Sequence, residues 1–131
     1  MCLLNLLDIS ATTPVVKRYL ESINDGKDPV NISGLVGSSP AILLAHAHRH
    51  CGGSMLVVVE DMANAEELAE DISALLDPGL VALFPPWEVL PYDQISPSGE
   101  LSGTRLKTLR ALLESRPQVI VTTVRAVLQR T

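Results

Sequence analysis

The sequence predicts an α/β fold in which a mostly parallel sheet is covered by helices on both faces. Four short segments of strand character alternate with amphipathic segments of helix length, and this alternation is typical of parallel sheets because each crossover needs a long connection. The composition fits a packed domain, with 131 residues of which 47% are hydrophobic and 19% charged. Only 3% are aromatic, so aliphatic side chains must fill the core.

The elements can be placed in chain order. Residues 1–11 are apolar but short, and we expect an arm or an irregular start. Thr13 and Pro14 begin a helix that Gly26 ends, since Thr favours the N-cap and Gly the C-terminal end. Two strands consist largely of Val, Leu and Ile, so we expect burial on both of their faces. The expected strands are 30–33, 55–59, 80–84 and 118–122, and the expected later helices are 40–51, 61–76, a stretch containing 106–113, and one after Thr123.

The segment 30–50 has the order of a phosphate-binding loop, with a strand, a glycine turn and a helix. In the pattern G-x-x-x-x-G-K-[ST], backbone N–H groups surround phosphate, the lysine reaches it and the hydroxyl holds Mg²⁺. Counted from the first glycine, the last three positions are Ser, Pro and Ala. The loop therefore keeps its shape but lacks the catalytic groups, and we expect no bound cofactor; an ordinary strand-to-helix turn is the alternative. Its residues are Gly34, Gly37, Ser38, Ser39, Pro40 and Ala41.

Two other groups of polar residues resemble known sites less closely. His46 and His50 are four residues apart on one expected helix, with His48 between them, but the glutamate of zinc-protease helices is absent because residue 47 is Ala. We expect no metal, and the role of the three histidines stays open. The strand 57–61 ends in acidic residues as magnesium-binding strands do, but Asp61 or Asn64 more simply caps the following helix. Neither group predicts a catalytic residue.

Charge and composition limit the function classes. The net charge of −5 argues against general nucleic-acid binding, although the C-terminal third carries six basic residues against two acidic ones. Two cysteines are too few for a disulfide framework. The start lacks a signal-peptide pattern, and no apolar run reaches membrane length. We therefore expect a cytoplasmic protein.

The segment 85–103 is the most distinctive part of the chain. It holds four of the nine prolines, the single tryptophan and one of the two tyrosines. Long loops in compact domains are usually functional or form interfaces, although these aromatic rings can also simply close the edge of the core. Together with the C-terminal strand and helix, the segment resembles the N-terminal region of bacterial transcription-repair coupling factors (Mfd). The matching strings are WEVLPYD at 87–93, SP at 96–97, RL at 105–106, TL at 108–109 and VIVTTVRAVLQR at 119–130.

The resemblance implies a UvrB-like module with a RecA-like fold and a degenerate ATP site. The residue pattern leads us to expect an N-terminal arm and helix over 1–28, and the resemblance implies that 29–131 are the first part of a UvrB-like domain of a longer chain. In that family ATP and Mg²⁺ act in a downstream motor, which translocates on DNA and displaces stalled RNA polymerase, and UvrA binds mainly through an insertion that follows this segment. The expected role here is a non-catalytic scaffold. The candidate interaction residues are Trp87, Tyr92, Arg105, Arg125 and Arg130.

Two other functions remain open. A nucleotide-binding excision-repair subunit of the UvrB type needs a lysine and a hydroxyl where Pro40 and Ala41 stand. A free-standing metal- or ligand-binding α/β domain rests on the histidine cluster alone.

Overall fold

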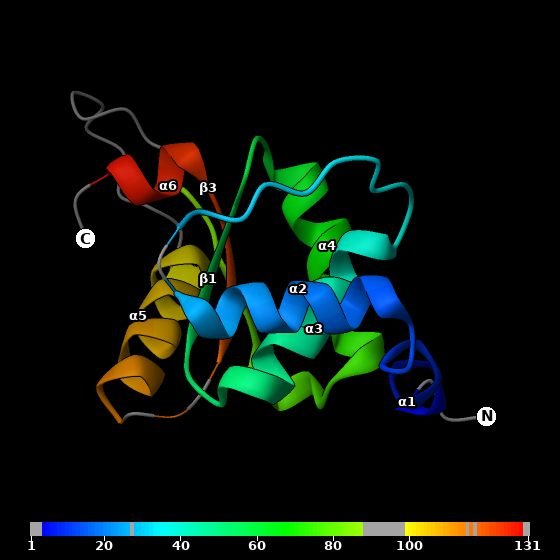
Figure 1. The fold of residues 1–131 in the computed structure, drawn as a ribbon. Coiled ribbons are helices and arrows are strands. Elements are labelled where there is room, and N and C mark those ends of the chain that lie inside the picture. Colours follow the sequence, from blue (N-terminus) through cyan, green and yellow to red (C-terminus); the bar gives the residue numbers. More distant parts are fainter. Residues whose placement is uncertain (1–3, 27, 88–98, 115, 117, 130–131) are drawn as a thin grey trace.

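The protein is a three-layer α/β domain (Figure 1). The computed structural model describes residues 4–26, 28–87, 99–114, 116 and 118–129. In chain order its elements are α1 (Leu4–Ser10), α2 (Pro14–Asp25), α3 (Ser39–Cys51), β1 (Met55–Val59), α4 (Met62–Leu75), the 3-10 turn η1 (Pro78–Leu80), β2 (Val81–Phe84), α5 (Gly99–Leu113), β3 (Val119–Thr123) and α6 (Val124–Leu128). This architecture confirms the predicted α/β class, while its assignment to the RecA-like group stays a prediction.

The sheet is parallel and has the order β1-β3-β2. The last strand in the sequence therefore lies in the middle. Met55 pairs with Val119 on one side, and Val81 pairs with the same residue on the other. All five residues of β3 are buried, including Thr122 and Thr123, so this strand is covered on both faces.

Local sequence fixes where several helices begin and end. The carboxylate Oδ1 of Asp61 accepts a hydrogen bond of 2.8 Å from the backbone N–H of Asn64, so Asp61 is the cap of α4. The hydroxyl of Thr123 accepts one of 3.2 Å from the N–H of Ala126 and caps α6 in the same way. Gly26 and Gly52 end α2 and α3 in the left-handed conformation, which glycine adopts without strain.

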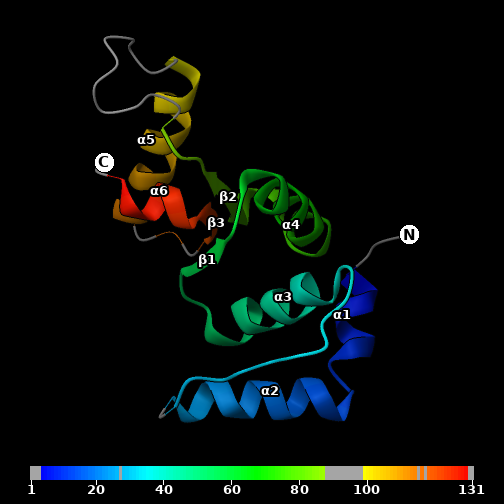
Figure 2. The same cartoon turned by 90° about the horizontal axis from the view of Figure 1, so that it is seen from above.

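The main core lies between one face of the sheet and helices α3 and α4 (Figure 2). Small side chains let these two helices approach closely: Ala41 and Ala45 of α3 and Ala65 of α4 are fully buried. Larger side chains fill the space against the strands. They include Ile72, Leu75 and Leu76 from the α4 region and Val119 and Val121 from β3.

The opposite face of the sheet is covered only in part. Helix α5 packs on β2, and α6 packs on β3. On β1, Leu56 and Val58 remain 59% and 46% exposed. The prediction that this strand is buried on both faces is therefore wrong, because β1 lies at the edge of the sheet farthest from α5.

The N-terminal residues form a helix and contribute to the core. The prediction of an arm or irregular start over 1–11 is wrong for the described part, since Leu4–Ser10 is helical. Leu7 is fully buried and belongs to the same core cluster as Ala41 and Ala45. A single buried leucine gives little periodic signal in so short a segment. Helix α2 packs on the outer side of α3 and adds to the helices on this side of the three-layer core (Figure 2).

Residues 28–38 also differ from the prediction. The expected strand at 30–33 is absent, and the segment runs as exposed chain from the end of α2 to the start of α3. Val30 and Ile32 alternate with polar residues but are both 42% exposed. A strand requires a neighbour with which to form hydrogen bonds, and local alternation cannot supply one.

Replacing the buried leucine of α1 tests whether this helix belongs to the core. We expect Leu7→Ala to lower the free energy of unfolding by about 2–5 kcal/mol, because it leaves a cavity in a closed cluster. Urea denaturation measures the change. Leu6→Ala is the matched control, since its side chain is 42% exposed and its loss should cost much less. Equal losses in the two variants would contradict the placement of α1.

Candidate functional site

The loop before α3 is folded into a tight turn without the groups that act on phosphate. Gly34 and Gly37 have φ angles of 78° and 58°, which other residues rarely adopt. The hydroxyl of Ser39 accepts a hydrogen bond of 2.8 Å from the N–H of Val36 and donates one to the Val36 carbonyl. Ser39 therefore closes its own loop. Pro40 follows it in the first turn of α3.

A hollow of about 280 Å³ lies between this loop and the N-terminal part of α4. Gly37 and Pro40 line one side, and Val59 at the carboxyl end of β1 lines another. The charged residues of its lining are Glu67 and Asp71, both acidic. Two carboxylates without a cation repel an anionic ligand, so the hollow is electrostatically unsuited to a triphosphate.

The histidines of α3 do not share one environment. His46 is buried, and its Nε2 lies 2.7 Å from the hydroxyl of Ser10, which links α3 to α1. His48 is also buried, whereas His50 is exposed. Burial lowers the pKa of His46, Arg49 lowers it further, and Asp8 opposes this shift. Within the described ranges, no group of three or more His, Cys, Asp or Glu side chains is arranged to hold a metal.

The beginning of the aromatic segment is built around a buried arginine. Arg105 of α5 is 2% exposed, and its guanidinium carbon lies 4.1 Å from the ring centre of Phe84 and 4.4 Å from that of Trp87. Its Nη1 donates a hydrogen bond of 2.6 Å to the carbonyl of Pro85. The guanidinium is thus held between two rings, an arrangement favoured by cation–π attraction. Burial lowers the pKa of Arg105.

The amide side chain of Gln129 fixes the same segment from the other side. Its Oε1 accepts a hydrogen bond of 2.6 Å from the N–H of Trp87, and its Nε2 donates one of 3.3 Å to the Trp87 carbonyl. Thr122 in β3 donates a hydrogen bond of 2.8 Å to the carbonyl of Phe84. Three elements therefore hold residues 84–87 in place.

The structure separates the five candidate interaction residues. Trp87 is half-buried beside Arg105, so its described contacts close the edge of the core. The described contacts of Arg105 are likewise within the domain. Arg125 of α6 is exposed and free to face a partner. Tyr92 and Arg130 lie outside the described residues.

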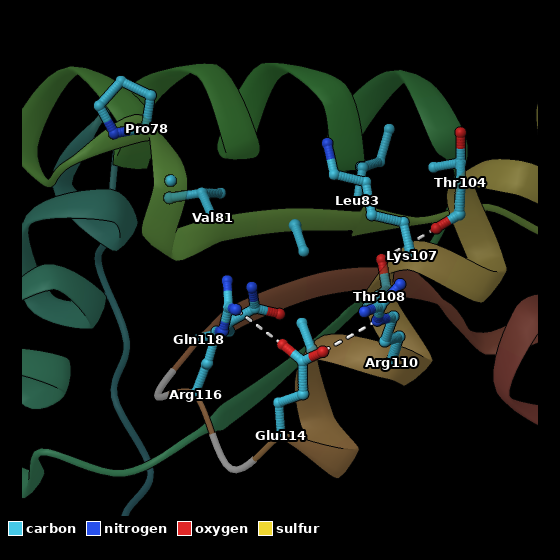
Figure 3. A pocket seen from close by; sticks show the side chains of 13 residues that line it. Pro78, Val81, Leu83, Thr104, Lys107, Thr108, Arg110, Glu114, Arg116 and Gln118 are labelled. Carbon is cyan, nitrogen blue, oxygen red and sulfur yellow. Dashed lines mark hydrogen bonds and ion pairs between the residues drawn. The ribbon is translucent and has the colours of Figure 1, made fainter.

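A basic pocket beside β2 was not foreseen from the sequence (Figure 3). It has a volume of about 520 Å³ and lies between β2, η1 and the C-terminal half of α5. Lys107, Arg110 and Arg116 line it, and Glu114 lies 2.8 Å from each of the two arginines. These residues belong to the positive C-terminal third, but only the fold shows that they border the edge of the sheet. In the described part of the chain, no helix has the length and apolar character needed to cross a membrane.

Three known proteins similar to this chain carry the same name. A transcription-repair-coupling factor of Escherichia coli (strain K12) is 31% identical over 117 residues, which are 89% of this chain and 10% of that protein. One from Mycobacterium bovis is 30% identical over 131 residues, covering 95% of this chain and 10% of the relative. One from Haemophilus influenzae is 35% identical over 75 residues, covering 57% and 6%. No family model matches. These relatives confirm the resemblance seen in the sequence.

Arg105 and the rings of Phe84 and Trp87 form what we call the arginine stack. The single tryptophan reports on this stack. We expect Arg105→Ala to shift the fluorescence emission of Trp87 to longer wavelength, because the ring loses its cover. The free energy of unfolding should fall by about 2–4 kcal/mol, since two ring contacts and a buried hydrogen bond are lost. Lys107→Ala, an exposed position on the same helix, is the control and should change neither quantity. An unchanged emission in Arg105→Ala would show that the stack does not hold Trp87.

His46 should make the stability of the domain depend on pH. Because burial lowers its pKa in the folded state, the unfolded chain binds the proton more readily, and stability falls as the pH falls below about 6.5. We expect His46→Gln to lose less stability than the wild type between about pH 7.5 and about pH 5.5 in urea titrations. His50→Gln, exposed on the same helix, should keep the wild-type dependence. The same pH dependence in all three proteins would refute the assignment.

Proposed function

Because the chain is homologous to the transcription-repair-coupling factors, we propose that it is a non-catalytic, UvrB-like scaffold module of such a protein, with a role in DNA repair. The chain spans about 10% of the length of these relatives. The activity of a whole coupling factor therefore requires parts outside this chain. On this proposal, the complete protein is an ATP-dependent DNA translocase of the cytoplasm, which displaces stalled RNA polymerase at lesions and recruits excision repair.

One observation carries the non-catalytic role. Pro40 and Ala41 occupy the positions where a working phosphate loop has its lysine and its hydroxyl. The surroundings of the loop agree with this loss, since Glu67 and Asp71 are the charged groups of the adjoining hollow. The hydroxyl of Ser39 is engaged with the backbone of Val36.

A scaffold must instead hold its own surface in a fixed shape, and the arginine stack supports this role. Phe84 and Trp87 are fixed by Arg105, Gln129 and Thr122, which belong to parts of the chain that follow the aromatic segment. The path of the chain out of β2 is therefore rigid where it begins. We propose that UvrA binds mainly through an insertion following this segment, and that RNA polymerase and DNA contact downstream domains. ATP and Mg²⁺ belong to the downstream motor.

Calorimetric titration with Mg-ATP tests the non-catalytic assignment. We expect no saturable heat of binding and no release of phosphate, because Pro40 and Ala41 stand where the lysine and the Mg²⁺-binding hydroxyl are needed, and the charged residues lining the adjoining hollow are acidic. Gly37→Ala provides the control for specificity, since its φ of 58° makes any side chain there unfavourable. Circular dichroism verifies that this variant is folded.

Tight Mg-dependent binding that is lost in a folded Gly37→Ala variant would overturn the proposal. It would favour instead a nucleotide-binding subunit of the UvrB type. Binding that is equal in the two proteins would place the nucleotide elsewhere on the domain and leave the loop without a nucleotide role.

A further inference from the structure

The outer edge of β2 is open. In the part of the chain that the structure describes, β2 has β3 on one side and no strand on the other. Residues 81–84 are half-buried, so this edge is reached from solvent. Alternate residues of an edge strand direct their N–H and C=O groups away from the sheet, and those groups can pair with an added strand. The proline residues Pro85 and Pro86 end the edge directly after Phe84.

The two sides of this edge carry opposite charge. On the α5 side, the pocket of about 520 Å³ is lined by three cations, Lys107, Arg110 and Arg116, and by one carboxylate, Glu114 (Figure 3). On the α4 side, a hollow of about 470 Å³ is lined by Val81 and Leu83 together with α4 residues whose charged members are acidic. Those members are Glu66 and Glu70.

A strand added at this edge would contact the basic side, toward α5, and the acidic side, toward α4, at the same time. Successive side chains of a strand point to opposite faces, so every second residue would face α5 and the others would face α4. Carboxylates suit the first set of positions, and basic side chains suit the second. A nucleic-acid backbone is negative throughout, and Glu66 and Glu70 therefore disfavour it along this edge.

We propose that the edge of β2 binds an extended segment of a partner protein as an additional strand. In that segment acidic residues, directed toward α5, alternate with basic residues directed toward α4. Backbone pairing supplies the affinity and the alternating charges supply the specificity, as in other strand-addition complexes. The site is separate from the phosphate loop, and it gives the scaffold a docking surface of its own.

Two synthetic peptides of equal composition test the proposal on the intact chain. In the first peptide, Glu and Lys alternate so that all Glu side chains face one side of the strand and all Lys side chains face the other; Thr and Val make up the rest. In the second peptide, the same Glu residues form one block and the same Lys residues form another. We expect the alternating peptide to bind about tenfold more tightly in fluorescence anisotropy, since several ion pairs form only in that order. Backbone amide signals of Val81–Phe84 should shift in NMR spectra when it binds.

Charge reversal assigns the binding to this edge. Lys107→Glu should lower the affinity for the alternating peptide several-fold. Arg125→Glu, an equal change of charge at an exposed residue of α6, should leave that affinity unchanged. Equal binding of the two peptides, the absence of binding, or amide shifts confined to other elements would each overturn the proposal. Stronger binding of a single-stranded oligonucleotide at the same amides would assign the edge to nucleic acid instead.

Discussion

The domain depends on the complete burial of β3. This strand pairs with β1 and with β2, and it supplies Val119 and Val121 to the core formed with α3 and α4. On its other face Ile120 and Thr122 are also buried. The hydroxyl of Thr122 is satisfied by the carbonyl of Phe84, which removes the cost of burying a polar group in this layer. Both layers of helices are positioned by one strand.

The arginine stack fixes the chain where it leaves the carboxyl end of β2. Arg105 of α5, Thr122 of β3 and Gln129 just beyond α6 all contact residues 84–87. Burying a guanidinium is expensive unless it is compensated. Two aromatic faces and one carbonyl provide the compensation here, although Nε and Nη2 have no hydrogen-bond partner among the described groups. The same helix presents Lys107 and Arg110 to the pocket beside β2, so one element serves both core and surface.

The sequence was sufficient where local patterns decide the structure. The three strands of the sheet and the glycine ends of α2 and α3 follow from apolar runs and from individual residue preferences, which also limit the cap of α4 to Asp61 or Asn64. The sequence was insufficient where the structure of a segment depends on contacts with residues distant in the chain. Among the described residues, 30–33 have the alternation of a strand but no pairing partner, and Leu56 and Val58 are apolar but have no described helix over them. Leu7 is buried only because α1 folds against α3.

The candidate sites also divide into those that residue identity alone predicts and those that depend on contacts between distant residues. The loss of the catalytic lysine and hydroxyl at Pro40 and Ala41 could be predicted from the sequence, because the chemistry of a phosphate loop depends on residue identity at fixed spacing. Arg105 and Arg125 looked alike in the sequence, yet one is enclosed by rings and the other is exposed. The basic pocket unites residues of α5 with η1 and with the residues that precede β3, and no spacing rule connects them.

The strand order also determines when the domain can fold. In the sheet β1 and β2 do not pair with each other, and both need β3, which begins at Val119 and lies near the end of this chain. Within the described sheet, neither earlier strand has a partner during synthesis on the ribosome until residues 119–123 have left the exit tunnel. Contacts between distant residues slow folding, and unpaired apolar strands invite association while they wait. The first two strands are therefore in greatest need of chaperone protection just before the third one emerges.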